Sequence, residues 1–480
     1  MPRCNNASAT SRPIIDFRSK TWSRNTTFTV LEQFKQSAMS TAVFSITEHS
    51  IPTSHIREYA RSTADGQEDV LQLAVKQYTP KESFRSSNGI TVIGAHANGF
   101  PKELYEPLWD ELYQRLKAKG IRIRSIWIAD VAHQGYSGVL NERNLGNDPS
   151  WMDHPRDLFL MVNHFRKKMK RPLIGIGHSM GGNNLVNLSI MHPRLFTTLI
   201  LIDPVIQRQL SKQGNFSPAK ASARRRDRWP SRQVAQASFK RSKFYQTWDP
   251  RVLDLWIKYG LRDLPTYLYP EATPASKTLP VLTADVSTAT VPPDASETEI
   301  TLATTKHQEV LTFLRPTPTS DQTLPVDATH PELDPEADPE LQFYSPALSP
   351  TFKKLPFVRP SVFYIYGDKS DLSAPLLKAD RREQTGVGIG GSGGVKAGRV
   401  SEVTFEGIGH LIPMEVVGRT ADAAASWIVP EIERWRKLED AERKEWAAVP
   451  KELKNQMPVA YVESLNRDGA GSAPKNTAKL

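Results

Sequence analysis

Cysteine is nearly absent from this chain, since Cys4 is the only one among 480 residues. A single thiol cannot close an intrachain disulfide, and it supplies at most one ligand to a metal site. A disulfide framework and a cysteine-based metal centre are therefore excluded, and a reducing or redox-indifferent compartment fits. No other motif requires a prosthetic group, so we expect no cofactor and no metal ion.

The chain also lacks a long apolar run. No segment approaches the roughly 18 consecutive apolar residues of a membrane-spanning helix, so we expect no transmembrane segment. Charged residues make up 24% and hydrophobic residues 39% of the sequence, which is typical of a globular protein and unlike a disordered or fibrous one. The length exceeds that of a typical single domain and allows one large core with insertions.

The chain is basic, but its excess of positive charge is modest. Lys and Arg number 62 against 52 Asp and Glu, a formal net charge of +10. This balance favours anionic partners, yet no nucleic-acid-binding motif accompanies it, and we expect no nucleic acid as partner. Arginines gather in residues 224–243, which form either a solvated helix face or a binding site for a phosphate-bearing substrate.

Strand and helix patterns alternate through residues 39–204 and again through residues 351–437. Alternating apolar residues predict strands, and apolar residues at helical spacing predict helices. Their alternation predicts an α/β fold, with a mostly parallel sheet covered by helices on both faces. The expected strands are 43–46, 70–78, 91–94, 121–129, 173–176, 198–202, 361–366 and 400–405, and the expected helices include 104–116, 151–169 and 180–191.

Three segments depart from this alternation. Residues 1–38 are basic and rich in Ser, Thr and Asn, which predicts a disordered N-terminal extension or a transit peptide, with Met39 as an alternative or the true start. Residues 205–350 predict an inserted helical cap, or lid, with a low-complexity loop. Residues 438–480 are expected to form a C-terminal helix and a flexible tail.

The motif Gly177-His178-Ser179-Met180-Gly181 follows an apolar strand and precedes a helix-compatible run. A sharp strand-to-helix turn needs small residues beside it, and it projects the serine oxygen above the sheet. The helix that begins at Met180 offers free N–H groups to a developing oxyanion. In this context the motif predicts an α/β-hydrolase fold with Ser179 as nucleophile, rather than a tight turn with a buried serine.

A nucleophilic serine needs a histidine base, which in turn is oriented by an acid. His410 follows the strand at 400–405, late in the chain, where the order Ser, acid, His requires it. Asp203 and Asp371 each follow a predicted sheet strand, and both geometries can orient a histidine. Asp203 could otherwise initiate a turn, and Asp371 could cap a helix.

The loop at residues 96–101 follows a sheet strand and suits the second part of an oxyanion hole. We expect the backbone N–H of Ala97 or Asn98 to act there together with that of Met180, although Asn98 could equally be a turn former. Residues 386–391 match GxGxxG without a βαβ setting, which predicts a flexible loop rather than a dinucleotide site.

The chain ends in Ala478-Lys479-Leu480, on a tail rich in Gly, Ala and Lys. This tripeptide is close to Ser-Lys-Leu, the peroxisomal address. It predicts a peroxisomal location and a peroxisomal import receptor as partner.

Several stretches together resemble a family of fungal peroxisomal α/β-hydrolases in secondary-metabolite biosynthesis. The family includes hydrolases of Alternaria host-selective toxin clusters and the acyl-CoA hydrolase of mycophenolic acid biosynthesis. The resemblance covers most of the chain, from about residue 39 to 435, whereas residues 1–38 have no counterpart. The matching stretches are 75–80, 101–109, 150–154, 175–182, 201–206 and 390–394.

The resemblance implies the catalytic residues Ser179, Asp203 and His410, and so favours Asp203 over Asp371. Some relatives lack an acid near position 371, whereas this sequence keeps one. The resemblance further implies a serine hydrolase of a toxin or other secondary-metabolite pathway, acting on an acyl-CoA thioester or an ester of a small-molecule acyl substrate. The alternatives are a general carboxylesterase or lipase and, from another class, a non-catalytic hydrolase-fold binding protein.

Overall fold

The computed structural model describes residues 41–82, 89–208, 216–271, 298–318, 324–333 and 342–468. The predictions for residues 1–38, for Met39 and for the tripeptide 478–480 fall outside the described residues. Most of the expected low-complexity loop also falls outside them.

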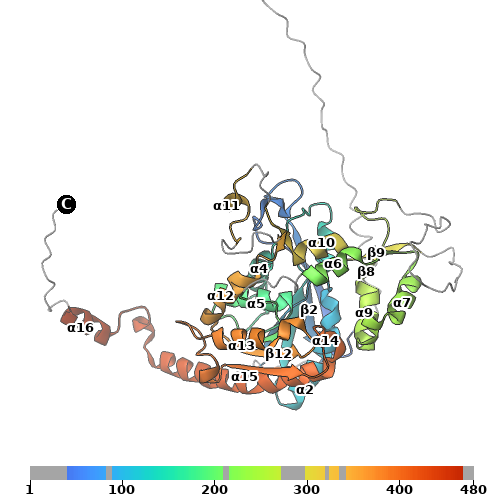
Figure 1. Ribbon diagram of the computed structural model, residues 1–480. Coiled ribbons are helices and arrows are strands. Elements are labelled where there is room, and N and C mark those ends of the chain that lie inside the picture. Colours follow the sequence, from blue (N-terminus) through green and yellow to red (C-terminus); the bar gives the residue numbers. More distant parts are fainter. Residues whose placement is uncertain are drawn as a thin grey trace, which may run out of the picture. The chain divides into compact units, whose positions relative to one another are not determined.

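The described residues contain an eight-stranded sheet in the order β1-β2-β4-β3-β5-β6-β12-β13 (Figure 1). Pairing is antiparallel from β1 to β2 and from β2 to β4, and parallel through the rest of the sheet. The predicted α/β fold with a mostly parallel sheet is confirmed. The strands are β1 (Phe44–Pro52), β2 (Gln72–Pro80), β3 (Ile90–Ala95), β4 (Ile123–Ala129), β5 (Leu173–His178), β6 (Thr198–Ile202), β12 (Ser361–Gly367) and β13 (Val400–Phe405).

Successive residues of the central strands face opposite sides of the sheet, because side chains alternate along a strand. On β3, for example, Val92 joins one buried apolar cluster and Ile93 joins the other. The first cluster contains side chains of α2 (Glu106–Ala118) and α15 (Val417–Ala448). The second contains side chains of α4 (Asp153–His164), α5 (Met180–Met191) and α12 (Leu348–Lys354). Figure 1 shows these two sets of helices on the two faces of the sheet.

Two expected helices begin or end differently in the structure. A short 3-10 helix, η2 (Lys102–Tyr105), precedes α2, and α4 ends at His164, before the expected end at residue 169. At the other end of the chain, α15 continues through residue 438, where the C-terminal segment was expected to begin. The other helices described are η1 (Ala60–Ser62), α3 (Gly135–Asn141), η3 (Leu355–Phe357), η4 (Asp371–Ser373), α13 (Pro375–Gln384), η5 (Val395–Ala397), α14 (Ile412–Glu415), η6 (Lys451–Leu453) and α16 (Val459–Asp468).

An insertion, residues 205–350, separates β6 from β12. Its described part combines short helices with a three-stranded sheet in the order β7-β9-β8 and with the pair β10-β11. The division of the chain into core and cap stays a prediction. The elements are α6 (Phe216–Arg224), β7 (Arg228–Trp229), α7 (Arg232–Arg241), α8 (Lys243–Gln246), α9 (Pro250–Tyr259), β8 (Leu261–Asp263), β9 (Ile300–Leu302), α10 (Lys306–Phe313), β10 (Arg315–Pro316), α11 (Val326–Thr329) and β11 (Phe343–Tyr344), followed by α12.

Arginines of the basic segment 224–243 form ion pairs within this insertion. Arg228 lies 2.7 Å from Glu299 and Arg232 lies 3.2 Å from Asp263, while Arg225 pairs with Glu309. These guanidinium groups therefore hold neighbouring parts of the insertion together.

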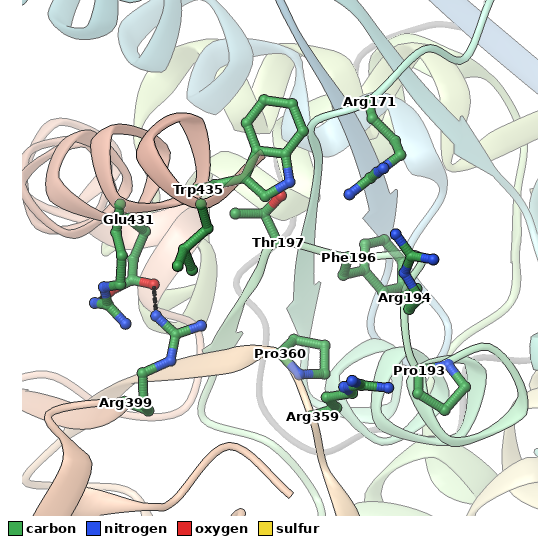
Figure 2. Close-up of a pocket in the computed structure, with 12 residues that line it drawn as sticks. Arg171, Pro193, Arg194, Phe196, Thr197, Arg359, Pro360, Arg399, Glu431 and Trp435 are labelled. Atoms are coloured by element: carbon green, nitrogen blue, oxygen red, sulfur yellow. Dashed lines mark hydrogen bonds and ion pairs between the residues drawn. The ribbon is translucent and has the colours of Figure 1, made fainter. Parts of the chain in front are cut away.

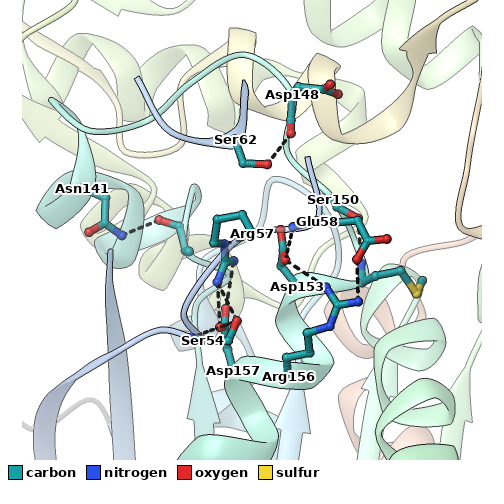
Figure 3. A network of polar contacts seen from close by, with 12 residues as sticks. Ser54, Arg57, Glu58, Ser62, Asn141, Asp148, Ser150, Asp153, Arg156 and Asp157 are labelled. Carbon is teal, nitrogen blue, oxygen red and sulfur yellow. Dashed lines mark hydrogen bonds and ion pairs between the residues drawn. The ribbon is translucent and has the colours of Figure 1, made fainter. Parts of the chain in front are cut away.

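A buried ion-pair cluster fastens the segment between β1 and β2 to α4 (Figure 3). Arg57 donates two hydrogen bonds to Asp157, with Nη1–Oδ1 at 2.8 Å and Nη2–Oδ2 at 3.1 Å. Its Nε lies 3.4 Å from Asp153 Oδ2, and the Glu58 N–H donates to Asp153 at 2.9 Å. Burial raises the pKa of Asp153 to about 6, although Arg57 opposes this shift. Asp153, which lies in the family-like stretch 150–154, is thus a structural carboxylate at the start of α4.

Among the described residues, no helix is both long enough and apolar enough to cross a bilayer. The glycine-rich motif at 386–391 follows α13 instead of a strand. There, the N–H groups of Gly386 and Gly388 donate to the carbonyl oxygens of Leu355 and Pro356, at 2.9 Å and 2.8 Å. The motif is therefore a loop tied to the chain before β12.

Candidate active site

Ser179 occupies a strained turn between β5 and α5. Its φ is +57° and its ψ is −117°, a combination that residues with a side chain rarely adopt. Two glycines make the turn possible: a Cβ on Gly177 would lie 2.5 Å from Gly181 O, and a Cβ on Gly181 would lie 2.1 Å from Ala95 O. The Ser179 N–H donates to Ile202 O at 2.9 Å. The turn places the serine at the carboxyl edge of the parallel strands.

Ser179, His410 and Asp203 form one hydrogen-bonded row. His410 Nε2 lies 2.9 Å from Ser179 Oγ, and His410 Nδ1 lies 2.6 Å from Asp203 Oδ2. The histidine comes from the loop after β13, and Asp203 directly follows β6. Asp371 is exposed at the start of η4, and among the described residues no hydrogen bond joins it to His410. Of the two candidate acids, the structure brings Asp203 to the histidine.

The Asp203 carboxylate is completely buried and accepts three hydrogen bonds. Besides His410, Ser370 donates to its Oδ2, and Ser373 donates to its Oδ1 at 2.6 Å. Burial alone would raise the pKa of Asp203, but the hydrogen bonds from His410 and from both hydroxyls outweigh burial and lower the pKa. Asp203 is therefore ionised and orients the imidazole ring with Nδ1–H toward itself.

His178 precedes Ser179 in the sequence and contacts the backbone of His410. Its Nε2 lies 2.9 Å from His410 O and its Nδ1 lies 3.0 Å from Tyr105 Oη. Burial lowers the pKa of His178 to about 3, so the ring is neutral. Because a carbonyl oxygen can only accept a hydrogen bond, the proton of the neutral ring is on Nε2. Nδ1 therefore accepts a hydrogen bond from the Tyr105 hydroxyl group. Tyr105 Oη in turn accepts the Ala97 N–H at 2.9 Å.

This hydrogen-bond chain changes the expected set of oxyanion donors. The Ala97 N–H is already bonded to the tyrosine hydroxyl, so Ala97, one of the three expected donors, is not free for an oxyanion. Met180 begins α5, where N–H groups of the first turn have no acceptor within the helix. Asn98 and Met180 are the backbone donors that remain.

The Asn98 side chain fixes the loop at residues 96–101 to the insertion. Its Nδ2 donates to the backbone oxygen of Glu309 on α10 at 3.0 Å, and its Oδ1 accepts from Gln134 at 2.6 Å. The Gly99 N–H donates to the same glutamine at 2.8 Å. The expectation of Asn98 as a turn former was thus incomplete, because its side chain joins two distant segments.

Sequence reasoning passed over Ser370, Ser373 and Tyr105. The two serines flank Asp371 directly after β12, so the segment singled out for its acid contributes hydroxyls instead. Tyr105 lies in the stretch 101–109 that carries part of the family resemblance. The signal available for all three was their position in segments that follow a sheet strand, at the carboxyl edge of the sheet.

The sheet order, the glycine-flanked turn after β5 and the histidine loop after β13 define the α/β-hydrolase class. A family model described as serine aminopeptidase, S33, matches residues 107–255, which include Ser179 and Asp203.

Two relatives and one solved structure extend this comparison. The type I acyl-CoA thioesterase mpaH of Penicillium roqueforti (strain FM164) is 44% identical, over 85% of this chain and 92% of the relative. The abhydrolase domain-containing protein AFT2-1 of Alternaria alternata is 26% identical, over 62% of this chain and 98% of the relative. The peroxisomal α/β-hydrolase Lpx1 of Saccharomyces cerevisiae has a similar fold, with a TM-score of 0.57 at 16% identity, over 89% of this chain and 96% of Lpx1.

The chain belongs to the family of α/β-hydrolases that includes the type I acyl-CoA thioesterase mpaH. The resemblance found in the sequence, and the prediction of a hydrolytic enzyme, are thereby confirmed.

The two candidate acids can be separated by substitution. Asp203→Asn should lower kcat by about 10³-fold to 10⁴-fold, because an amide no longer holds the histidine in the required tautomer. Asp371→Asn should stay within about twofold of the unmodified protein, since its side chain is exposed. Hydrolysis of p-nitrophenyl acetate by proteins with matching circular dichroism spectra measures both. A loss confined to Asp371→Asn would contradict the geometric assignment.

Stability should fall as the pH drops below about 6.5, because buried histidines resist protonation. Burial lowers the pKa of His96, His133, His154 and His178, to about 3 for His133 and His178. Between pH 6.5 and about 3 the unfolded chain binds protons at His133 and His178 that the native protein does not, so the native state loses about 1.4 kcal/mol per pH unit for each of these two rings.

Urea unfolding at pH 7.5 and 5.5 measures this slope. The ring of His154 has no hydrogen-bond partner among the described residues. His154→Leu should therefore reduce the slope of unfolding free energy against pH by the contribution of one histidine. His192→Ala, at an exposed histidine, should leave the slope unchanged. An equal slope in all three proteins would refute the assignment of the acid sensitivity to buried rings.

Proposed function

We propose that this hydrolase is an acyl-CoA thioesterase of a fungal secondary-metabolite pathway, with Ser179, His410 and Asp203 as its catalytic triad. The observation that carries the proposal is the hydrogen-bonded row from Ser179 Oγ through His410 to Asp203, with distances of 2.9 Å and 2.6 Å. The thioester substrate class is supported by a relative that is 44% identical, the type I acyl-CoA thioesterase mpaH.

In the proposed reaction, His410 Nε2 takes the proton of Ser179 Oγ while Oγ attacks the thioester carbonyl. The N–H groups of Asn98 and Met180 stabilise the oxyanion of the tetrahedral intermediate. When the intermediate collapses, the C–S bond breaks and the imidazolium protonates the leaving thiolate. Water, deprotonated by His410, then attacks the acyl-serine; the C–Oγ bond breaks, His410 returns the proton to Ser179 Oγ, and the carboxylic acid is released. Asp203 stays ionised throughout and stabilises the imidazolium.

Two other functions compete with this one. A general carboxylesterase or lipase would use the same triad on an oxygen ester. A non-catalytic binding protein of the same fold would not need Ser179 within hydrogen-bond distance of a histidine that contacts an ionised carboxylate. The triad therefore argues against the binding role, and the leaving group distinguishes the other two.

The proposed activity is tested by matched substrates that share an acyl group. Thioesters of CoA should be hydrolysed with a kcat/KM at least about 100-fold above that of the corresponding methyl esters. Thiol release, followed with a disulfide reagent, measures the first reaction, and acid release at constant pH measures the second. Ser179→Ala should remove about 10⁴-fold or more of the activity on thioesters.

The opposite ratio, faster hydrolysis of simple esters, would favour the carboxylesterase. Unchanged turnover in Ser179→Ala, together with no labelling of the protein by a fluorophosphonate, would favour the binding role.

We place the enzyme in the peroxisome, with the import receptor reading residues 478–480. The support is the similarity of Ala-Lys-Leu to Ser-Lys-Leu and the resemblance to a peroxisomal family. A fluorescent protein fused to the N-terminus of the full chain should mark peroxisomes in a fungal host. Deleting the three residues should leave the fusion in the cytosol, and unchanged peroxisomal fluorescence would contradict the assignment.

A further inference from the structure

A basic pocket lies at the amino edge of the sheet (Figure 2). It has a volume of about 180 Å³. Its floor includes Phe196 and Pro360, and Trp435 of α15 forms part of its wall. Five arginines line it, four from turns that precede β5, β6, β12 and β13 and one from α15: Arg171, Arg194, Arg359, Arg399 and Arg434.

Acidic groups balance only part of this charge. Glu431 is the one carboxylate in the lining, so five positive charges and one negative charge leave +4. Glu431 pairs with Arg399 at 2.6 Å and also with Arg434. Outside the lining, Glu439 pairs with Arg171 through contacts of 3.0 Å and 2.7 Å.

Arg194 and Arg359 are exposed, and no carboxylate pairs with either of them within the described residues. Each guanidinium carries five N–H donors in a planar fork, which fits the oxygens of a phosphate group in a bidentate manner. Arginines gathered around one cavity repel one another, so an anion between them would stabilise the folded protein.

The aromatic wall adds a second element of recognition. The Arg171 guanidinium lies 5.3 Å from the centre of the Trp435 ring, which is half-buried. Burial also lowers the pKa of Arg399, so this cation is incompletely solvated where it faces the pocket. Indole and guanidinium groups offer flat faces on which a nucleobase can stack.

From this arrangement, we infer that the pocket binds a small phosphate-bearing ligand, with Arg194 and Arg359 as the principal contacts. The site is separate from the proposed thioesterase centre. The six residues of β5 separate Arg171 from Ser179, and at about 3.3 Å per residue they span roughly 20 Å. A phosphate group held here therefore does not belong to a substrate whose acyl carbon reaches the nucleophile through the carboxyl edge.

Calorimetric titration of the full chain tests this inference, with inorganic phosphate and adenosine 3′,5′-bisphosphate as probes at constant ionic strength. We expect a Kd of about 1 mM or tighter for at least one probe. The double variant Arg194→Ala/Arg359→Ala should weaken binding by about 100-fold, as expected from the loss of two charged hydrogen bonds. The control Arg166→Ala/Arg382→Ala, which removes two exposed arginines outside the pocket, should bind like the unmodified protein.

The two probes separate the sources of the phosphate. Equal affinities indicate a site for the phosphate group itself. Binding of the bisphosphate that is about tenfold tighter, and is lost in Trp435→Leu, indicates a nucleotide. Ser179→Ala should leave either affinity unchanged, so the outcome does not depend on the proposed activity. No binding up to about 10 mM, or equal binding in the pocket variant and in the control, overturns the inference.

Discussion

The backbone at Ser179 is the constraint on which the site depends. A side chain at φ +57° costs about 1–3 kcal/mol, and this strain persists because the surrounding structure leaves no alternative. Gly181 lies against the backbone of Ala95, which brings the start of α5 onto β3. The same turn sets the direction of the serine oxygen and the position of the Met180 N–H. The proposed nucleophile and the proposed oxyanion donor are therefore both positioned by one close approach between two glycines and a neighbouring strand.

A second constraint links the loop at residues 96–101 to His410. Hydrogen bonds run from the Ala97 N–H to Tyr105, from Tyr105 to His178, and from His178 to the backbone of His410. The direction of every proton in this chain is determined, because its two ends are a backbone donor and a backbone acceptor and the His178 ring is neutral. Asn98 extends the connection to α10 of the insertion. The insertion is thus joined to His410 through the loop that we propose holds the oxyanion.

Local patterns predicted the strands, the turn at Ser179 and the position of His410, because each depends on residues close together in the sequence. Nothing in the neighbouring sequence distinguishes Asp203 from Asp371 as the acid, since both follow a strand at the same edge of the sheet. It depends on which carboxylate Ser370 and Ser373 surround, and these hydroxyls lie 167 and 170 residues away from Asp203. The error over Ala97 has a nearer origin: the Tyr105 hydroxyl that occupies its N–H lies only 8 residues along the chain, and position after a strand does not show whether an N–H is already bonded.

The two edges of the sheet differ in charge for a reason visible in its topology. At the carboxyl edge, Asp203 contributes a buried carboxylate and His178 a neutral ring, which suits a reaction that generates an oxyanion and an imidazolium together. At the amino edge, an arginine precedes each of four strands, at positions 171, 194, 359 and 399. These arginines are scattered in the sequence and form no motif. The order β5-β6-β12-β13 makes those strands neighbours, and parallel pairing brings their first residues, and therefore their arginines, to one pocket.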